Sequence, residues 1–539
     1  MVMALGLMPL GLGADKQTNP YDDEEEAAPS PSKMSPGEAA ARRACTMCHA
    51  FPTPDMLDKK HWKEQVLPRM QVRLGVAQPD YSTTPDAELI KQRKVYTETP
   101  MIPAEQWPPI EQWVLENAPE NPLPLDPRPP ITVGLNLFKT EPAPFRTREP
   151  TTTLVKISPK RHQIYVGDDK EKLLFILNSD GTLAEVIKVG NVPADVVETE
   201  QGIYVTCVGS FLPTEVYCAE LDFFARKGEG FGEKQVILKD LPRATQAAFA
   251  DFNGDGKLDF ALCMFGNLTG RFSWYENLGE GQYREHVLSL KAGAMRCLAH
   301  DFNGDGKMDL GVLMAQELEM LIIMFNDGKG NFTGDTIMQR PPIWGHMHFE
   351  LIDYNDDPFP DLLVVNGDNG EYDSPLKKYH GLRIYVNKSN NKFEEAWYYP
   401  MNGAYKALAR DFDQDGDLDI AAISFFPDYK DAPKESFVYL ENQGGFAFKT
   451  STFRECIAGR WIVMDAEDLD GDGDLDIVLG SYVQGPAGSP VPAWLVNLWK
   501  QQGLSVLILR NQLSERKLSR RDRGNAGPQP APAPAGGRP

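Results

Sequence analysis

The sequence has no surplus of positive charge and no long apolar segment. Its 539 residues carry a formal net charge of -22, and no basic stretch with interleaved aromatic residues is present, which argues against a nucleic-acid partner. The apolar stretch at residues 1–14 is too short to span a bilayer. A P-loop, a dinucleotide fingerprint and a Ser/His/Asp grouping are also absent, so the sequence indicates no catalytic residues and favours a carrier or binding protein over an enzyme.

Cysteine and histidine are scarce, with 7 and 8 residues in the chain. The pentapeptide Cys45-Thr-Met-Cys48-His49 has the spacing of covalent c-type haem attachment, in which two thiols bond to the porphyrin and the histidine binds the iron. The alternative interpretation is that this pentapeptide forms half of a zinc site. It would need a second Cys or His pair nearby, and only His61 occurs before His162. The motif therefore predicts one covalent haem c.

Five further cysteines, an odd number, lie outside this motif. At least one of them is expected to be a free thiol unless it pairs between chains. Cys207 and Cys218 lie on consecutive predicted strands, where they either bridge a hairpin or remain buried free thiols. The other three are Cys263, Cys297 and Cys456.

Acidic residues are concentrated in a nine-residue loop that occurs five times. The loops begin at Asp251, Asp301, Asp353, Asp411 and Asp468, at intervals of 50 to 58 residues. Positions 1, 3, 5 and 9 are Asp or Asn, and position 6 is glycine in four copies. This arrangement directs several oxygens to one point, where a hard cation such as calcium offsets their repulsion. The regular spacing indicates a repeat array.

Each loop lies between two short apolar runs, such as AFAD before and FALCMFG after the first loop. A third run ends at an asparagine, and a fourth begins near an aromatic residue. Runs of four to eight residues bounded by glycine and asparagine are typical of strands. Four strands in roughly fifty residues predict one blade of a β-propeller.

The repeats resemble the FG-GAP (VCBS) family over about residues 240 to 512. Besides the loops, the resemblance includes Phe265-Gly266, Gly293-Ala294-Met295 and Gly403-Ala404-Tyr405. It implies an integrin-type seven-bladed propeller with calcium in the loop between the first two strands of a blade. The third copy departs from the pattern because Pro358 replaces the glycine at position 6. Four to five calcium ions are therefore expected.

The candidate calcium ligands occupy positions 1, 3, 5, 7 and 9 of the loops. They are Asp251, Asn253, Asp255, Lys257, Asp259; Asp301, Asn303, Asp305, Lys307, Asp309; Asp353, Asn355, Asp357, Phe359, Asp361; Asp411, Asp413, Asp415, Asp417, Asp419; and Asp468, Asp470, Asp472, Asp474, Asp476.

Two blades without calcium loops are predicted between Ile131 and Arg243, which brings the number of blades to seven. The last repeat supplies only three strands. The segment from Leu137 to Phe145 resembles its missing fourth strand, so we expect it to close the ring and remove an exposed sheet edge.

The front of the chain resembles a small all-α class I cytochrome c domain. Residues 37–44 predict a helix leading into the haem motif, residues 61–75 are partly helical, and residues 106–118 resemble the C-terminal helix of that family. The sixth iron ligand is chosen by this resemblance. Trp62 to Met70 matches the family's W-x-x-x-V-x-x-M pattern with one extra residue, which makes Met70 the first choice, Met101 the second and Met56 the third.

The sequence divides into six segments. The predicted boundaries are 1–14 for a signal peptide, 15–37 for an acidic linker, 38–120 for the haem domain, 121–134 for a proline-rich linker, 135–513 for the propeller, and 514–539 for a basic and then Pro/Ala-rich tail. The signal peptide, the calcium loops and the covalent haem all favour a periplasmic or secreted location.

Polar residues at the start of the innermost strands are predicted to line the mouth of the central channel. They are Arg296, His346, His348, Lys406, Arg460 and Trp461. This set would suit a small anion or an acidic protein patch, although channel mouths are also polar for solubility alone.

Three functions fit these features. In the first, the haem transfers electrons to a redox partner protein or an extracellular acceptor, and the propeller is the docking platform. In the second, the propeller is an oxidoreductase module for a sugar or alcohol. In the third, it binds glycans or mediates adhesion. The blocks GHMHFE, YHGLRIYVN, GAYKALARDFD and GRWIVMD resemble bacterial secreted proteins that fuse a c-type haem domain to FG-GAP repeats. Fold alone does not decide among the three.

Overall fold

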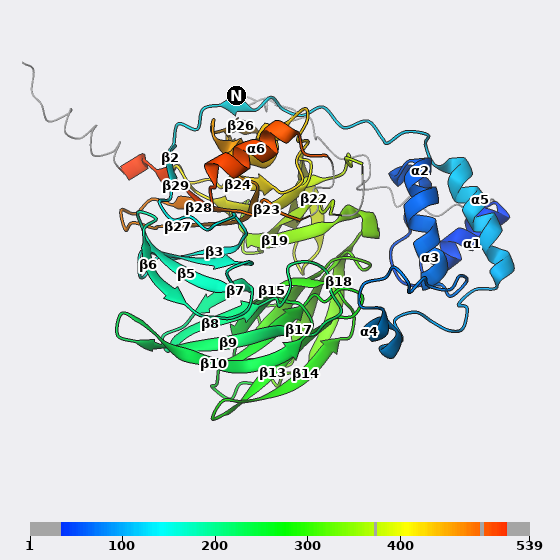
Figure 1. Ribbon diagram of the computed structural model, residues 1–539, viewed down its shortest axis with the longest axis horizontal. Helices are drawn as coiled ribbons and strands as arrows, with labels where there is room; N and C mark the ends of the chain where they lie inside the picture. Colours follow the sequence, from blue (N-terminus) through cyan, green and yellow to red (C-terminus); the bar gives the residue numbers. More distant parts are fainter. Residues whose placement is uncertain (1–33, 371–374, 486–489, 515–539) are drawn as a thin grey trace, which may run out of the picture.

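The computed structural model describes residues 34–370, 375–485 and 490–514. It consists of a small helical unit and a large ring of sheets, which lie side by side in Figure 1. The predicted signal peptide, the predicted linker up to residue 33 and the predicted tail from residue 515 lie outside the described residues. Within the described residues, no helix is long and apolar enough to cross a membrane.

The ring contains seven sheets, which confirms the predicted seven-bladed propeller. In chain order, the first two blades contain β3 (Thr152–Ser158), β4 (Gln163–Asp168), β5 (Leu173–Asn178) and β6 (Leu183–Ile187), then β7 (Pro193–Glu198), β8 (Gly202–Cys207), β9 (Ala219–Lys227) and β10 (Gly230–Leu241). These are the two predicted blades without calcium loops.

Blades three to five each contain one of the first three acidic loops. Their strands are β11 (Ala244–Ala250), β12 (Asp259–Met264), β13 (Arg271–Gly279), β14 (Gln282–Ser289); β15 (Ala294–His300), β16 (Asp309–Met314), β17 (Met320–Asn326), β18 (Phe332–Gln339); and β19 (His346–Ile352), β20 (Asp361–Asn366), β21 (Gly381–Asn387), β22 (Phe393–Pro400).

The sixth and seventh blades contain the last two loops. Their strands are β23 (Ala404–Arg410), β24 (Asp419–Ser424), β25 (Phe437–Asn442), β26 (Phe448–Thr452); and β27 (Trp461–Glu467), β28 (Asp476–Ser481), β29 (Val506–Asn511).

The seventh blade is completed by β2 (Phe138–Pro142), which pairs antiparallel with β29 from Phe138 opposite Asn511 to Pro142 opposite Leu507. The predicted ring closure is therefore confirmed. A second strand from the front of the propeller was not predicted: β1 (Thr132–Val133) adds to the sixth blade, parallel to β26.

The core lies between neighbouring blades. In each blade that contains an acidic loop, the second strand, from β12 to β28, is buried along its whole length because both of its faces pack against other blades. Burial on both faces explains why these strands are continuous apolar runs. The seven innermost strands also contact their neighbours around a closed ring, from β3 through β27 and back to β3.

The helical unit is built from short helices. They are α1 (Pro36–Cys45), α2 (Lys59–His61), a π-helical turn (Trp62–Val66), α3 (Leu67–Arg73), α4 (Ala87–Gln92) and α5 (Trp107–Asn117). The three predicted helical regions are present, whereas α4 was not predicted. α1 and α5 cross closely at Gly37, where a Cβ atom would lie 2.6 Å from the Pro109 carbonyl oxygen and 2.8 Å from Trp113 Cβ.

The proline-rich segment after α5 runs across the edge of the propeller, seen in cyan at the top of Figure 1. Arg128 forms an ion pair with Glu435, and Asp126 Oδ1 lies 3.7 Å from Lys378 Nζ. Another unpredicted element is α6 (Ala493–Gln502), a helix inserted between β28 and β29 and anchored by buried Leu495 and Trp499.

Candidate functional site

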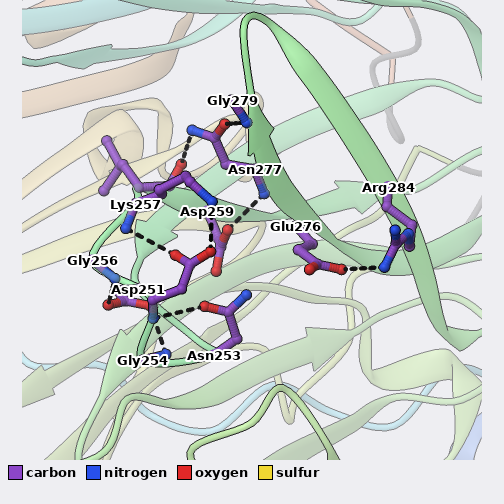
Figure 2. A network of polar contacts seen from close by, with 12 residues as sticks. Asp251, Asn253, Gly254, Gly256, Lys257, Asp259, Glu276, Asn277, Gly279 and Arg284 are labelled. Atoms are coloured by element: carbon purple, nitrogen blue, oxygen red, sulfur yellow. Dashed lines mark hydrogen bonds and ion pairs between the residues drawn. The ribbon is translucent and has the colours of Figure 1, made fainter.

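The first acidic loop, in the turn between β11 and β12, is organised by its leading aspartate (Figure 2). Asp251 Oδ1 accepts N–H groups from Gly254 (2.8 Å) and Asp255 (3.2 Å), and its Oδ2 accepts the N–H of Gly256 (2.8 Å). Gly254 and Gly256 have φ angles of 75° and 80°, which glycine adopts without strain. Asp301 makes the same three contacts in the second loop.

The aspartate at position 9 is turned into the blade. Asp259 is fully buried; its Oδ2 accepts the N–H of Phe252 (3.1 Å) and its Oδ1 that of Asn277 (2.7 Å). Asn277 in turn donates from its side chain to the Leu258 carbonyl oxygen (3.1 Å). The pair therefore ties the loop to the end of the third strand.

The position-9 carboxylate accepts the N–H of an asparagine at the end of the third strand in every loop-bearing blade. The five asparagines are Asn277, Asn326, Asn387, Asn442 and Asn511. In the sequence, these asparagines were interpreted only as turn residues, so this contact was not predicted. Their recurrence at one position of each repeat could have indicated a shared structural role. Burial raises the pKa of Asp419 and Asp476 to about 7.

The fourth and fifth loops contain the densest groups of acidic side chains. Carboxylate oxygens of Asp411, Asp413 and Asp415 lie within 4.8 Å of one another, as do those of the corresponding three aspartates of the fifth loop, Asp468, Asp470 and Asp472. Burial, and then the neighbouring carboxylates, raise the pKa of Asp413. Like charges held this close disfavour the ionised form unless a cation lies among them.

Unpartnered buried oxygens test whether a cation would fit. Among the described residues, Asp413 Oδ1, Asp417 Oδ1 and Asp474 Oδ1 are buried without a hydrogen-bond partner. These atoms occupy positions 3 and 7, where the repeat predicts ligands. Buried oxygens that lack donors are the groups that calcium coordination would satisfy. The donor set, which contains only oxygen, fits calcium.

The other loops differ in charge. Lys257 and Lys307, at position 7, pair with the position-5 carboxylates Asp255 (2.9 Å) and Asp305 (3.1 Å), and these contacts lower the pKa of both aspartates. The third loop has Pro358 at position 6. Because proline has no N–H, Asp353 lacks the donor that Gly256 supplies to Asp251. The third loop is therefore the weakest candidate among the five.

The predicted haem-attachment motif begins at the end of α1. Ser35 Oγ accepts the Glu38 N–H (3.1 Å) at the start of this helix, and Cys45 is its last residue. Both motif cysteines are free thiols, Cys45 half-buried and Cys48 exposed, and burial raises the pKa of Cys45 to about 11. The five other cysteines are also free in the structure, so no bridge joins Cys207 to Cys218.

The geometry of His49 suits a metal ligand. Its Nδ1 lies 2.8 Å from the Ala50 carbonyl oxygen, which can only accept a hydrogen bond, so Nδ1 carries the proton. Nε2 of the neutral ring then has a free lone pair. A histidine ligand is commonly held in this way, with its second nitrogen donating to a backbone carbonyl. The motif therefore fits a covalent haem.

The three candidate methionines differ in burial. Met70, in α3, is partly buried and packs against the apolar core of the helical unit. Met101 is 47% exposed, and Met56 lies half-buried in a short 3-10 turn. The extra residue between Trp62 and Met70 coincides with the π-helical turn, in which the Leu67 N–H bonds to the Trp62 carbonyl. A π turn absorbs one additional residue in a helix.

The helical unit contacts the propeller through α4 and the segment that follows it. Asp86 Oδ2 accepts the side-chain hydroxyl of Thr214 and the N–H of Glu215, both at 2.8 Å. Arg93 forms an ion pair with the buried Glu215 (3.2 Å) and lies 3.6 Å above the Tyr217 ring. Ile343 packs against the apolar core of the helical unit. These contacts join the helical unit to the face of the propeller opposite the acidic loops.

The six residues predicted at the channel mouth separate into two groups. His346, Arg460 and Trp461 are buried and satisfied: His346 Nδ1 lies 2.6 Å from Glu319 Oε2, Arg460 Nε donates to the Tyr429 hydroxyl (2.9 Å), and Trp461 Nε1 donates to a backbone carbonyl. These three residues stabilise blades and do not line an open mouth, so the prediction needs correction for them. The sequence did not show which side chains at the start of an innermost strand face the channel.

The other group consists of Arg296, His348 and Lys406. Each is the first residue after a bulge at the start of its innermost strand, on three consecutive blades. Arg296 and Lys406 are partly exposed, whereas His348 is 4% exposed. The same position on the other four innermost strands is occupied by Leu154, Asp195, Gln246 and Val463. The channel-mouth role of Arg296, His348 and Lys406 stays a prediction.

Comparisons with known proteins agree with the architecture. Residues 251–312, 301–364, 353–422 and 411–479 each match the family model described as FG-GAP-like repeat. No curated protein gives a match.

Three solved structures are similar to this chain at low identity. A luciferin-regenerating enzyme is 10% identical, with 53% of this chain and 88% of that chain covered and a TM-score of 0.34. The N-terminal domain of Nup159 is 11% identical (72% and 98% covered, TM-score 0.39), and BBS1N in complex with ARL6DN is 9% identical (70% and 97% covered, TM-score 0.41). The repeat match and the seven sheets together show that this chain contains a seven-bladed β-propeller with FG-GAP-like repeats.

Proposed function

We propose that this protein is an extracytoplasmic electron-transfer protein, with one covalent haem c on the helical unit and a calcium-stabilised propeller as its docking platform. The observation that carries the proposal is the arrangement of Cys45, Cys48 and His49. One free thiol ends α1 and the second lies in the turn that follows, beside a histidine whose Nδ1 proton is fixed by a backbone carbonyl.

The residues of the helical unit have distinct roles in this proposal. Cys45 and Cys48 form the thioether links, and His49 Nε2 binds the iron. Met70 is the sixth ligand, because it is the candidate methionine that packs against the apolar core beside the motif. The haem supplies one-electron redox chemistry, and methionine ligation raises its potential.

The propeller supports a docking role. FG-GAP-like repeats are typical of extracellular proteins and of binding domains, and covalent haem attachment takes place outside the cytoplasm. The α4 contacts through Asp86 and Arg93 hold the haem-bearing unit against the propeller. A redox partner protein that docks on the propeller would therefore meet the haem in a fixed orientation. A periplasmic or secreted location follows from the same features.

The absorption spectrum of the purified, exported protein tests the haem assignment. We expect a reduced c-type spectrum that survives acid-acetone extraction, because thioether bonds retain the haem. The oxidised protein should show the weak near-infrared band of methionine ligation. Met70→Ala should remove that band, whereas Met101→Ala should keep it.

Loss of the band in Met101→Ala alone would overturn the choice of Met70. A colourless protein, exported from a strain that matures other c-type cytochromes, would overturn the haem proposal itself. The double variant Cys45→Ala/Cys48→Ala is the matched control, since it should release haem on extraction while the propeller still folds.

A further inference from the structure

The innermost strands of the propeller are tied to one another by side-chain acceptors. Asp465 accepts the Ile157 N–H (2.8 Å), Gln246 accepts the Cys297 N–H (2.8 Å), and Glu350 accepts the Ala409 N–H (3.0 Å). In each pair the acceptor belongs to one blade and the N–H to the next. Glu350 also pairs with Arg410 at 2.7 Å. These acceptors already have donors.

Three side chains on blades four to six, Arg296, His348 and Lys406, make few contacts with acceptor groups, although the partly buried Asp195 is near enough to Arg296 to interact with its charge. Arg296 uses only Nε, which donates to the Phe349 carbonyl oxygen (2.8 Å). Among the described residues, no carboxylate lies within 4.0 Å of the Lys406 ammonium or the Arg296 guanidinium, and neither ring nitrogen of the buried His348 has a partner. A nearly fully buried imidazole without any hydrogen bond is rare in proteins.

These three residues lie at one level of the ring of innermost strands. Arg296, His348 and Lys406 share one register position on β15, β19 and β23, whose neighbouring strands are in contact. Burial lowers the pKa of Lys406 to about 8; Asp465 and Glu350 oppose this shift, and Arg296 and Lys156 add to it. Asp195 occupies the same register position on β7, so a carboxylate also belongs to this level of the ring.

We propose that Arg296, His348 and Lys406 form a binding site for a small oxyanion, the head group of a phosphate or carboxylate compound, inside the central passage of the propeller. The oxygens would accept from the Arg296 guanidinium, one His348 N–H and the Lys406 ammonium. Charge-assisted bonds of this type are the strongest hydrogen bonds in proteins. The site contains none of the residues that are proposed to bind haem or calcium.

Calorimetric titration with inorganic phosphate and, separately, with malonate tests the proposal. We expect saturable binding of at least one of the two to the full chain, and the anion that binds identifies the head group. Lys406→Met should weaken binding by about tenfold or more, because one charge-assisted hydrogen bond is lost. His348→Gln is a second variant of similar size, in case Lys406→Met folds poorly.

Lys156→Met is the matched control. This lysine lies on β3, another innermost strand, but its Nζ is 3.5 Å from Asp465 Oδ2 and therefore already has a carboxylate partner. Binding to this variant should stay within about twofold of the unaltered protein. Because all variants keep the five acidic loops, removal of calcium by the added anion affects them equally. Absence of saturable binding to the unaltered protein at millimolar anion, or an equal loss in Lys156→Met, would refute the site.

Discussion

Removal of calcium with EGTA is expected to lower the thermal midpoint of the propeller by at least about 10 °C. A ligand that binds only the folded state contributes about 4 kcal/mol per site at 1,000 times its dissociation constant, and four to five loops are candidates. Without the ion, the clustered carboxylates of the fourth and fifth loops repel one another, and Asp413 Oδ1 and Asp417 Oδ1 remain buried without partners. Differential scanning calorimetry with and without EGTA measures the effect.

Two matched variants assign the effect to the loops. Asp411→Asn keeps one oxygen for the loop N–H groups but removes a charge from the densest cluster, so it should eliminate one bound calcium and lower the midpoint in saturating calcium. Asp353→Asn makes the same change in the loop that contains Pro358. We expect it to have the smaller effect. If EGTA leaves the midpoint of the unaltered protein unchanged, the loops do not hold calcium.

Phe138→Ala is expected to destabilise the propeller by about 3–5 kcal/mol. Phe138 is the first residue of β2 and is 5% exposed. Its ring lies 5.6 Å from the Phe412 ring and 5.7 Å from the Tyr439 ring, both in edge-to-face contact. The substitution therefore leaves a cavity between the sixth and seventh blades and weakens the strand that closes the ring. Urea unfolding followed by tryptophan fluorescence measures the change.

Lys139→Ala is the control at the neighbouring position of the same strand. The Lys139 side chain is 61% exposed and pairs with Glu141 at 2.8 Å, a surface ion pair worth about 0–1 kcal/mol. If Phe138→Ala and Lys139→Ala have equal effects, β2 is not a structural part of the seventh blade in solution. A larger loss in Phe138→Ala, accompanied by aggregation, would match exposure of the β29 edge.

The parts of the fold that repeat could be predicted from the sequence. The acidic loop occurs five times between apolar runs, and the similarity of Phe138-Lys139-Thr140 to the fourth strand of the preceding blade was sufficient to predict closure of the ring. Features that occur once could not be predicted in this way. β1 has only two residues, and its pairing with β26 depends on where the proline-rich segment crosses the sixth blade. No local sequence pattern predicts where one segment crosses another blade.

The sequence contains a weak indication of helix α6, although this helix was not predicted. Leu495 and Trp499 are four residues apart, the spacing of one helical face, and both are buried. At the channel, the sequence predicted which residues begin the innermost strands but not which of them are covered. His346 and His348 illustrate the limit, because one is bonded to Glu319 and the other has no partner, although only Met347 separates them.

The pairing of β2 with β29 constrains how the protein is made. One strand of the seventh blade is translated before every other blade, and its partner is translated after them. While the chain emerges, the ring therefore stays open, and the edge of β2 remains unpaired. Assembly of the complete propeller has to wait until translation has passed Asn511, so a chaperone that protects the unpaired edge must act from the emergence of β2 until β29 is available.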